Sequence, residues 1–215
     1  MELKYKDWKD ISINTFNKLI KVNTKGNNIE MLDNNVELLS ILCDVSEDEI
    51  LKLTTTEFTS LLQQTSFLIN MPKAKIQDTY IINGKTYKVF LSLKNMSVAQ
   101  YIDFQTYYKE RDKRLKELLS VFLIPQNKKY GEDYDIDEVI NDIGEYLSIV
   151  DAHSIMFFFV LLFQTLTRVM MDCSIKDLKK MKKKQKNKEE ITKLETAITE
   201  IEKIKHLVKN GIGYI

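Results

Sequence analysis

The sequence predicts a mainly α protein with one embedded antiparallel β-hairpin and a long C-terminal helix. Three observations support this fold class. Only two prolines and six glycines occur in 215 residues, so few positions would interrupt a helix. Apolar side chains recur at helical spacing over most of the chain. One segment, DTYIINGKTYKVFLSL, instead reads as two short strands about an Asn-Gly pair, which is typical of a hairpin.

The first 70 residues are expected to form short helices. Ser12 can cap a first helix in which Phe16 and Ile20 lie on one face. Three more helices are expected over residues 34–70. Two of them begin at capping boxes, where a Ser or Thr precedes a Glu by three residues: Ser46 with Glu49, and Thr54 with Glu57.

The hairpin is expected near residues 77–92, with Asn83-Gly84 as a two-residue type I′ turn. This register sets Tyr80 opposite Tyr87 and Ile81 opposite Thr86. Because an isolated hairpin is marginal in water, it should pack on a helix or pair with strands of another chain. Tyr80 and Tyr87 are therefore candidate strand-pairing contacts.

The next segment is expected to be helical up to Pro125. Ser97 and Gln100 form a third capping box, and the charged KERDKR stretch that follows predicts a bend or break before Leu115. The aromatic residues at helical spacing in this helix suit either core packing or an exposed face for a partner: Tyr101, Phe104, Tyr107 and Tyr108. Asp135 and Glu138 predict the start of another capped helix.

The most apolar stretch of the chain is SIMFFFVLLFQTLTRVMM, residues 154–171. Polar residues interrupt its second half, so it falls short of the roughly 20 apolar residues of a membrane span. Since its centre is apolar on every face, the helix should be covered all round, by its own domain or by another subunit. The candidate interaction residues here are Phe157, Phe158, Phe159, Leu162 and Phe163.

A change of composition near residue 175 predicts two parts, a helical domain over 1–175 and a lysine-rich C-terminal helix and tail over 176–215. The helix carries a short heptad seam that can dock on the same chain or on another: Ile191, Leu194, Ile198 and Ile201. The lysine run before it suits a solvated face, which the net charge of +1 favours, or contact with DNA or an acidic protein. Its candidate phosphate contacts are Lys179, Lys180, Lys183 and Lys184.

No residue pattern points to catalysis. The sequence contains no nucleophile motif and no phosphate-binding glycine loop, and its two histidines and two cysteines are too few and too scattered for a zinc site. Asp151 and His153 are expected to border a helix rather than to act as an acid–base pair. The charged start MELKYKDWKD lacks the apolar core of a signal peptide, so an intracellular protein is expected, without enzyme activity, metal or cofactor.

Several segments together resemble a known group of proteins. They are WKDISINTF, ILCDVSEDEILKLTTTEF, YIINGKTYKVFLSL with SVAQYIDFQ, LKELLSVFLIPQNKKYGEDYD and the Phe-rich helix at 155–163. This pattern, over roughly residues 5–175, resembles small morphogenesis proteins of AT-rich tailed phages of gut Bacteroidetes, including crAss-like phages. The abundance of Asn and Lys agrees with an AT-rich genome.

The resemblance implies a non-enzymatic protein that works through protein contacts. Some proteins of this kind are built into the particle around the portal and tail, as rings or internal cargo, and this is the expected function. An alternative is a tail assembly chaperone that is absent from the mature particle. The expected partners are other phage structural proteins or further copies of this chain, in the virion or in the host cytoplasm during assembly, and DNA contact is a third alternative.

Overall fold

The structure, a computed structural model, describes residues 1–22, 28–73, 75–90, 95–111 and 113–209. For residues 28–30, 160–170 and 204–209 the description covers the backbone alone. The chain divides into two compact units, Met1–Met156 and Phe157–Ile215, called here the N-terminal and C-terminal units. The sequence placed the boundary near residue 175, whereas this division falls within a helix that runs through both positions.

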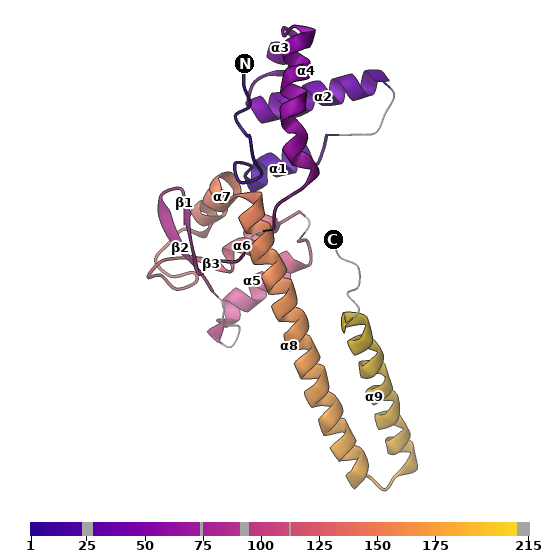
Figure 1. The fold of residues 1–215 in the computed structure, drawn as a ribbon. Coiled ribbons are helices and arrows are strands. Elements are labelled where there is room, and N and C mark those ends of the chain that lie inside the picture. The colour runs from indigo at the N-terminus through magenta and orange to yellow at the C-terminus, as the bar shows by residue number, and fades with distance from the viewer. Residues whose placement is uncertain (23–27, 74, 91–94, 112, 210–215) are drawn as a thin grey trace. The chain divides into compact units, whose positions relative to one another are not determined.

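The N-terminal unit begins with a group of helices (Figure 1). They are α1 (Ile13–Leu19), α2 (Asn28–Cys43), α3 (Glu47–Leu51), α4 (Thr55–Gln64) and the 3-10 helix η1 (Thr65–Ile69). The Ser12 hydroxyl accepts a hydrogen bond from the Thr15 N–H at the start of α1, as the sequence predicts. Apolar side chains from α2 and α3 fill the centre of this group, and Leu39, Leu42 and Ile50 are fully buried.

The start of α4 shows how a local sequence signal fixes a helix boundary. The Thr54 hydroxyl accepts a hydrogen bond from the Glu57 N–H, and the Glu57 carboxylate accepts one from the Thr54 N–H at 2.9 Å. Both halves of the predicted capping box are therefore present. They satisfy backbone donors that the first turn of a helix leaves without partners.

We expect Thr54→Ala to lower the free energy of unfolding by about 1 kcal/mol, because alanine cannot accept the Glu57 N–H bond. Urea denaturation followed by circular dichroism measures the change. Thr56→Ala is the matched control, since Thr56 is an exposed residue of the same first turn. Equal losses in the two variants would contradict the assignment of Thr54 as the cap.

The sheet contains β1 (Thr79–Ile82), β2 (Lys85–Val89) and β3 (Leu123–Pro125) in the order β1-β2-β3, all antiparallel. The predicted register of the hairpin is confirmed, with Tyr80 opposite Tyr87 and Ile81 opposite Thr86. Asn83 and Gly84 both have positive φ, at 49° and 70°, which a type I′ turn requires. The third strand was not predicted, because three residues are too few to show a period.

Helices α5 (Val98–Tyr108) and α6 (Leu115–Ser120) lie between β2 and β3 in the sequence. The predicted break between these two helices is present. The Ser97 hydroxyl caps α5 by accepting from the Gln100 N–H. The other half of the predicted box is not formed, because the buried Gln100 amide donates to the Val121 carbonyl at 2.7 Å instead. Gln100 thus ties α5 to the end of α6.

Helix α7 (Ile136–Tyr146) contacts α1, α6 and β1. The side chains of one face of the hairpin are buried, namely Tyr80, Ile82, Tyr87 and Val89, and the opposite face carries the exposed Thr79, Ile81 and Lys88. Burial thus alternates along both strands, as expected for a sheet covered on one side. The backbone of Ile149 also donates to the Ile11 carbonyl at 2.8 Å, which joins the first residues to the start of the next helix.

That next helix, α8 (Ile149–Lys184), runs without interruption through Ser174, where the sequence suggested a new segment. A three-residue connection leads to the long C-terminal helix α9 (Lys188–Lys209), so the lysine-rich segment expected to form one helix over 176–215 is divided between the end of α8 and α9. Lys182 lies 2.5 Å from Glu195, and Lys179 lies 3.2 Å from Glu202. Because the residue number rises along α9 as it falls along α8, these pairs define an antiparallel helical hairpin. The fold class predicted from the sequence is therefore confirmed, with β3 as an addition.

Candidate functional site

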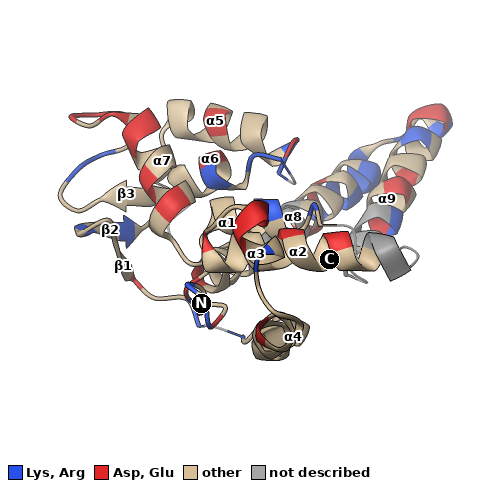
Figure 2. Ribbon diagram, turned by 90° about the horizontal axis from the view of Figure 1, so that it is seen from above, with Lys and Arg blue, Asp and Glu red and all other residues tan. Residues whose placement is uncertain are grey.

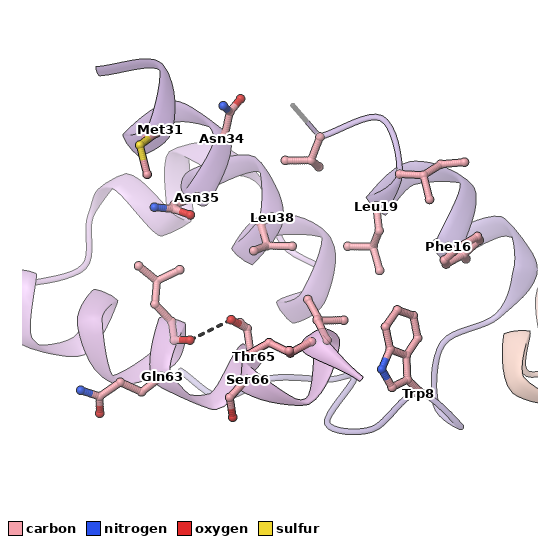
Figure 3. A pocket seen from close by; sticks show the side chains of 15 residues that line it. Trp8, Phe16, Leu19, Met31, Asn34, Asn35, Leu38, Gln63, Thr65 and Ser66 are labelled. Atoms are coloured by element: carbon pink, nitrogen blue, oxygen red, sulfur yellow. Dashed lines mark hydrogen bonds between the residues drawn. The ribbon is translucent and has the colours of Figure 1, made fainter. Parts of the chain in front are cut away.

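The N-terminal unit contains an apolar groove of about 650 Å³ between α1, α2 and the α4–η1 segment. Figure 3 shows Trp8, Leu19 and Leu38 facing this hollow from three different segments. Its lining comprises Trp8, Phe16, Leu19, Ile20, Val22, Met31, Asn34, Asn35, Leu38, Leu62, Gln63, Thr65, Ser66, Leu68 and Ile69. We call this surface the apolar groove.

Trp8 holds one wall of the apolar groove in place. Its indole N–H donates to the Phe67 carbonyl at 2.8 Å, and its ring lies edge-on to the Phe67 ring at 6.2 Å. The centroid of the Phe16 ring lies 6.1 Å from that of Trp8. A buried tryptophan with its N–H paired is a rigid support, so Trp8 fixes η1 relative to α1.

Much of the apolar groove is open to solvent. Ile69 is 79% exposed, Ile20 is 60% exposed and Met31 is 48% exposed. Single exposed apolar residues are common, but three that border one apolar hollow form a patch of the kind that binds partners. No sequence pattern indicates this patch, since its residues come from three segments that only the fold brings together.

The lining explains what the apolar groove can do chemically. Among the residues that the structure describes, the lining contains no Asp, Glu, Lys, Arg, His or Cys. Its polar members are amides and hydroxyls. The Asn34 Nδ2 atom is buried and has no hydrogen-bond partner among the described residues. Such a surface suits the binding of an apolar segment rather than of a charged small molecule.

A polar cluster of the N-terminal unit lies where the hairpin turn meets α7. The Asp142 carboxylate accepts hydrogen bonds from the Asn83 amide at 2.8 Å, the Lys85 ammonium at 2.9 Å and the Tyr87 hydroxyl at 2.9 Å. Glu138, one turn earlier, pairs with Lys85 at 2.7 Å. Glu138 was expected to complete a capping box with Asp135, but it contacts the hairpin instead.

The cluster fixes the charge of its central carboxylate. Burial raises the pKa of Asp142, but the bonds from Lys85, Asn83 and Tyr87 together outweigh burial and hold the pKa below its usual value. The Tyr87 pKa is raised, first by burial and then by its bond to Asp142. The donor groups of Asn83, Lys85 and Tyr87 all bind the Asp142 carboxylate. This arrangement is typical of a structural ion cluster that attaches a hairpin to a helix.

Tyr80 and Tyr87, the residues expected to pair with strands of another chain, lie within the sheet of this chain. The Tyr80 and Tyr87 side chains are buried, with Tyr87 fully so. The prediction that Tyr87 pairs with another chain needs correction, because its backbone lies between Tyr80 of β1 and Pro125 of β3 in the same chain. Tyr80 remains on the outer strand of the sheet.

The Phe-rich stretch of α8 is not uniformly covered. Phe159 is buried, Phe158 is half-buried, and Phe157 is 56% exposed. The Phe158 and Phe159 rings meet edge to face at 5.3 Å. The side chains of Leu162 and Phe163 lie outside the described residues. No helix among the described residues has the length and apolar character needed to cross a membrane.

The C-terminal seam lies in the helical hairpin of α8 and α9. Ile198 is buried, whereas Ile191, Leu194 and Ile201 are half-buried. Ile175 of α8 is buried as well. The ion pairs that join the two helices are within one chain.

The lysine run is partly neutralised by acids. Figure 2 shows blue and red residues interspersed along α8 and α9. Lys179 pairs with Glu202, and Lys180 lies 3.4 Å from Asp177. Lys183 and Lys184 have no ion pair among the residues that the structure describes. Two of the four candidate phosphate contacts therefore already have an acidic partner.

The other residues considered as functional candidates in the sequence contact neighbouring residues of the fold. Asp151 accepts a hydrogen bond from the Ser148 hydroxyl, which in turn accepts one from the Asp151 N–H at the start of α8. His153 packs edge-on against Phe16 at 6.2 Å. The aromatic set of α5 divides, since Phe104 is buried and Tyr101 is 53% exposed. Within the described residues, no group of three or more His, Cys, Asp or Glu side chains is placed to hold a metal ion.

Comparison with known proteins finds no match. No family model fits the chain, and no curated protein or solved structure is significantly similar to it.

Proposed function

We propose that this protein is a non-enzymatic morphogenesis protein of a tailed bacteriophage, built into the portal–tail region of the particle through protein contacts. The observation that carries the proposal is the apolar groove. It is open, it contains no ionisable side chain, and Trp8 supports it rigidly. A preformed apolar surface of this kind favours a partner segment with apolar side chains. The sequence segments that resemble phage morphogenesis proteins supply the biological setting.

A tail assembly chaperone is the second candidate, and one observation favours it. The apolar groove is open in a single chain, which is what transient binding of an apolar client segment requires. Mass spectrometry of purified particles that encode this protein separates the two candidates. A virion component should be present at a fixed ratio to the portal protein, whereas a chaperone should be missing from the particles but present in the infected cell.

A variant in the apolar groove tests its role directly. We expect Ile69→Asp to reduce incorporation of the protein into particles by about tenfold or more, because docking would bury an unpaired carboxylate. Quantitative mass spectrometry of particles made with each variant measures the loss. Ile69 is 79% exposed, so the substitution should leave the unfolding midpoint of the free protein almost unchanged.

The matched control is Ile102→Asp on α5, which makes the same substitution at an exposed isoleucine outside the apolar groove. Incorporation of this variant should equal that of the wild type. Normal incorporation of Ile69→Asp would refute the role of the apolar groove. Equal losses in both variants would show that added charge, rather than the groove, controls assembly.

A further inference from the structure

One edge of the sheet has no strand partner among the described residues. The strand order is β1-β2-β3, so β1 forms one edge and β3 the other (Figure 1). The described backbone and side-chain hydrogen bonds include none to the N–H or C=O groups of Thr79 or Ile81 beyond the strand pairing itself.

The hydrogen-bond ladder of the hairpin shows which way the backbone N–H and C=O groups of Thr79 and Ile81 point. Val89 donates its N–H to the Asp78 carbonyl at 2.9 Å, so residues 78 and 89 form a hydrogen-bonded pair. Such pairs alternate in an antiparallel ladder, so Tyr80 and Ile82 also bond to β2. Thr79 and Ile81 therefore direct their N–H and C=O groups away from β2, toward the open edge.

The side chains of β1 leave this edge unprotected. Natural edge strands are usually blocked by charged residues, proline or a bulge. The strand Thr-Tyr-Ile-Ile contains no charge and no proline, and its pairing with β2 is regular over all four residues. Ile81 is 79% exposed on the uncovered face. An apolar residue on an open, uncharged edge is typical of a strand that pairs with another chain.

We propose that β1 pairs antiparallel with β1 of a second copy of this chain, which would give a six-stranded sheet. The β1 edge is self-complementary, which favours a second copy of the chain as its partner. If Tyr80 of the two copies lie opposite each other, Thr79 of each copy faces Ile81 of the other. All four outward N–H groups then meet outward C=O groups, in four backbone hydrogen bonds. This inference goes beyond the proposed function and does not depend on it.

Charge does not oppose this pairing. Within one copy, Lys88 lies beside Thr79 on the uncovered face. In the proposed register the two copies of Lys88 are three strand spacings apart across the sheet and two residues apart along it, a separation of about 16 Å. This distance exceeds the Debye length of about 8 Å at physiological salt, so the two ammonium groups repel each other only weakly. The Ile81 side chain of each copy packs instead beside Thr79 of the other.

The association should be weak, because four strand residues bury far less surface than a stable dimer interface. Analytical ultracentrifugation of the full-length protein up to about 1 mM should show a monomer–dimer equilibrium. Hydrogen exchange of the Thr79 and Ile81 amides should slow as protein concentration rises. A strictly monomeric protein over this range would overturn the proposal.

Two variants identify the edge responsible. Thr79→Pro removes an outward N–H at the first residue of β1 without removing a bond to β2, and Ile81→Lys places charge on the edge. Each should raise the dissociation constant at least about tenfold, a change of roughly 1.4 kcal/mol. The control Thr86→Lys adds the same charge to the same face of β2, away from the edge, and should dimerise like the wild type.

The unfolding midpoint of each variant is measured alongside, so that a loss of association is not confused with a loss of folding. An unchanged dissociation constant in folded Thr79→Pro and Ile81→Lys would assign the association to another surface and overturn the proposal. A loss in Thr86→Lys equal to that in Ile81→Lys would also contradict it.

Discussion

Replacing Asp142 with alanine should lower the free energy of unfolding of the N-terminal unit by about 2–4 kcal/mol. Asp142 is only 6% exposed and accepts hydrogen bonds from Asn83, Lys85 and Tyr87. Its removal leaves the fully buried Tyr87 hydroxyl without its partner and separates the hairpin turn from α7. Chemical denaturation followed by tyrosine and tryptophan fluorescence measures the loss.

The matched control is Glu138→Ala, which removes the other acid that pairs with Lys85. The Glu138 side chain is 61% exposed, and an exposed ion pair contributes little to stability. The unfolding midpoint should therefore change only slightly. If the two variants lost similar stability, the buried contacts of Asp142 would not be the source of the effect.

The contribution of Asp142 should depend on pH in a defined direction. Because its pKa is lower in the folded protein than its usual value, the ionised carboxylate favours the folded state. The contribution is fully present above about pH 4 and is lost as pH falls through the depressed folded pKa. The difference in unfolding free energy between wild type and Asp142→Ala should thus stay constant from neutral pH down to about 5 and shrink below about 4. A difference that grows on acidification would contradict this account.

Replacing Phe122 with alanine should be the most destabilising of the substitutions considered, at about 3–5 kcal/mol. Phe122 is 1% exposed and meets the Phe104 ring edge-on at 5.5 Å. Its carbonyl also accepts the Phe90 N–H at 2.7 Å, so the residue lies where α5, the end of α6 and the sheet converge. Truncation leaves a cavity. The surrounding helices and sheet cannot move inward to fill it, because their contacts with one another hold them in place.

Phe157→Ala provides the control, because it deletes the same atoms from a side chain that is 56% exposed. The loss of stability should be below about 1 kcal/mol. Thermal and urea unfolding of the two variants are compared under identical conditions. Similar unfolding midpoints for both variants would mean that Phe122 is not part of the core.

The hairpin shows how much of this fold local chemistry specifies. An Asn-Gly pair tolerates the two positive φ angles of a type I′ turn, and this turn length fixes the register of the flanking strands. Thr54 and Glu57 likewise define the start of α4 within four residues. These predictions succeed because every group involved lies close in sequence.

Two predictions from the same kind of local motif were wrong, because residues distant in the sequence bind the side chains instead. Gln100 and Glu138 match the capping-box pattern, yet both side chains bind elsewhere, Gln100 to Val121 and Glu138 to Lys85. Strand β3 has no sequence signature, and it exists because its backbone pairs with β2. A local motif offers only one of the partners that folding makes available, and the tertiary contact replaces it where the tertiary contact is the stronger.

The sequence by itself determined the mainly helical class, the hairpin with its register, the break before α6 and the long C-terminal helix. Each of these follows from side-chain period, turn chemistry or capping within a few residues. Only the tertiary structure decided that Tyr87 is enclosed by β3, that Asp142 joins the hairpin to α7, and that Trp8, Leu38 and Ile69 border one apolar groove. Those arrangements depend on residues far apart in the chain, and periodicity carries no information about which distant surfaces meet.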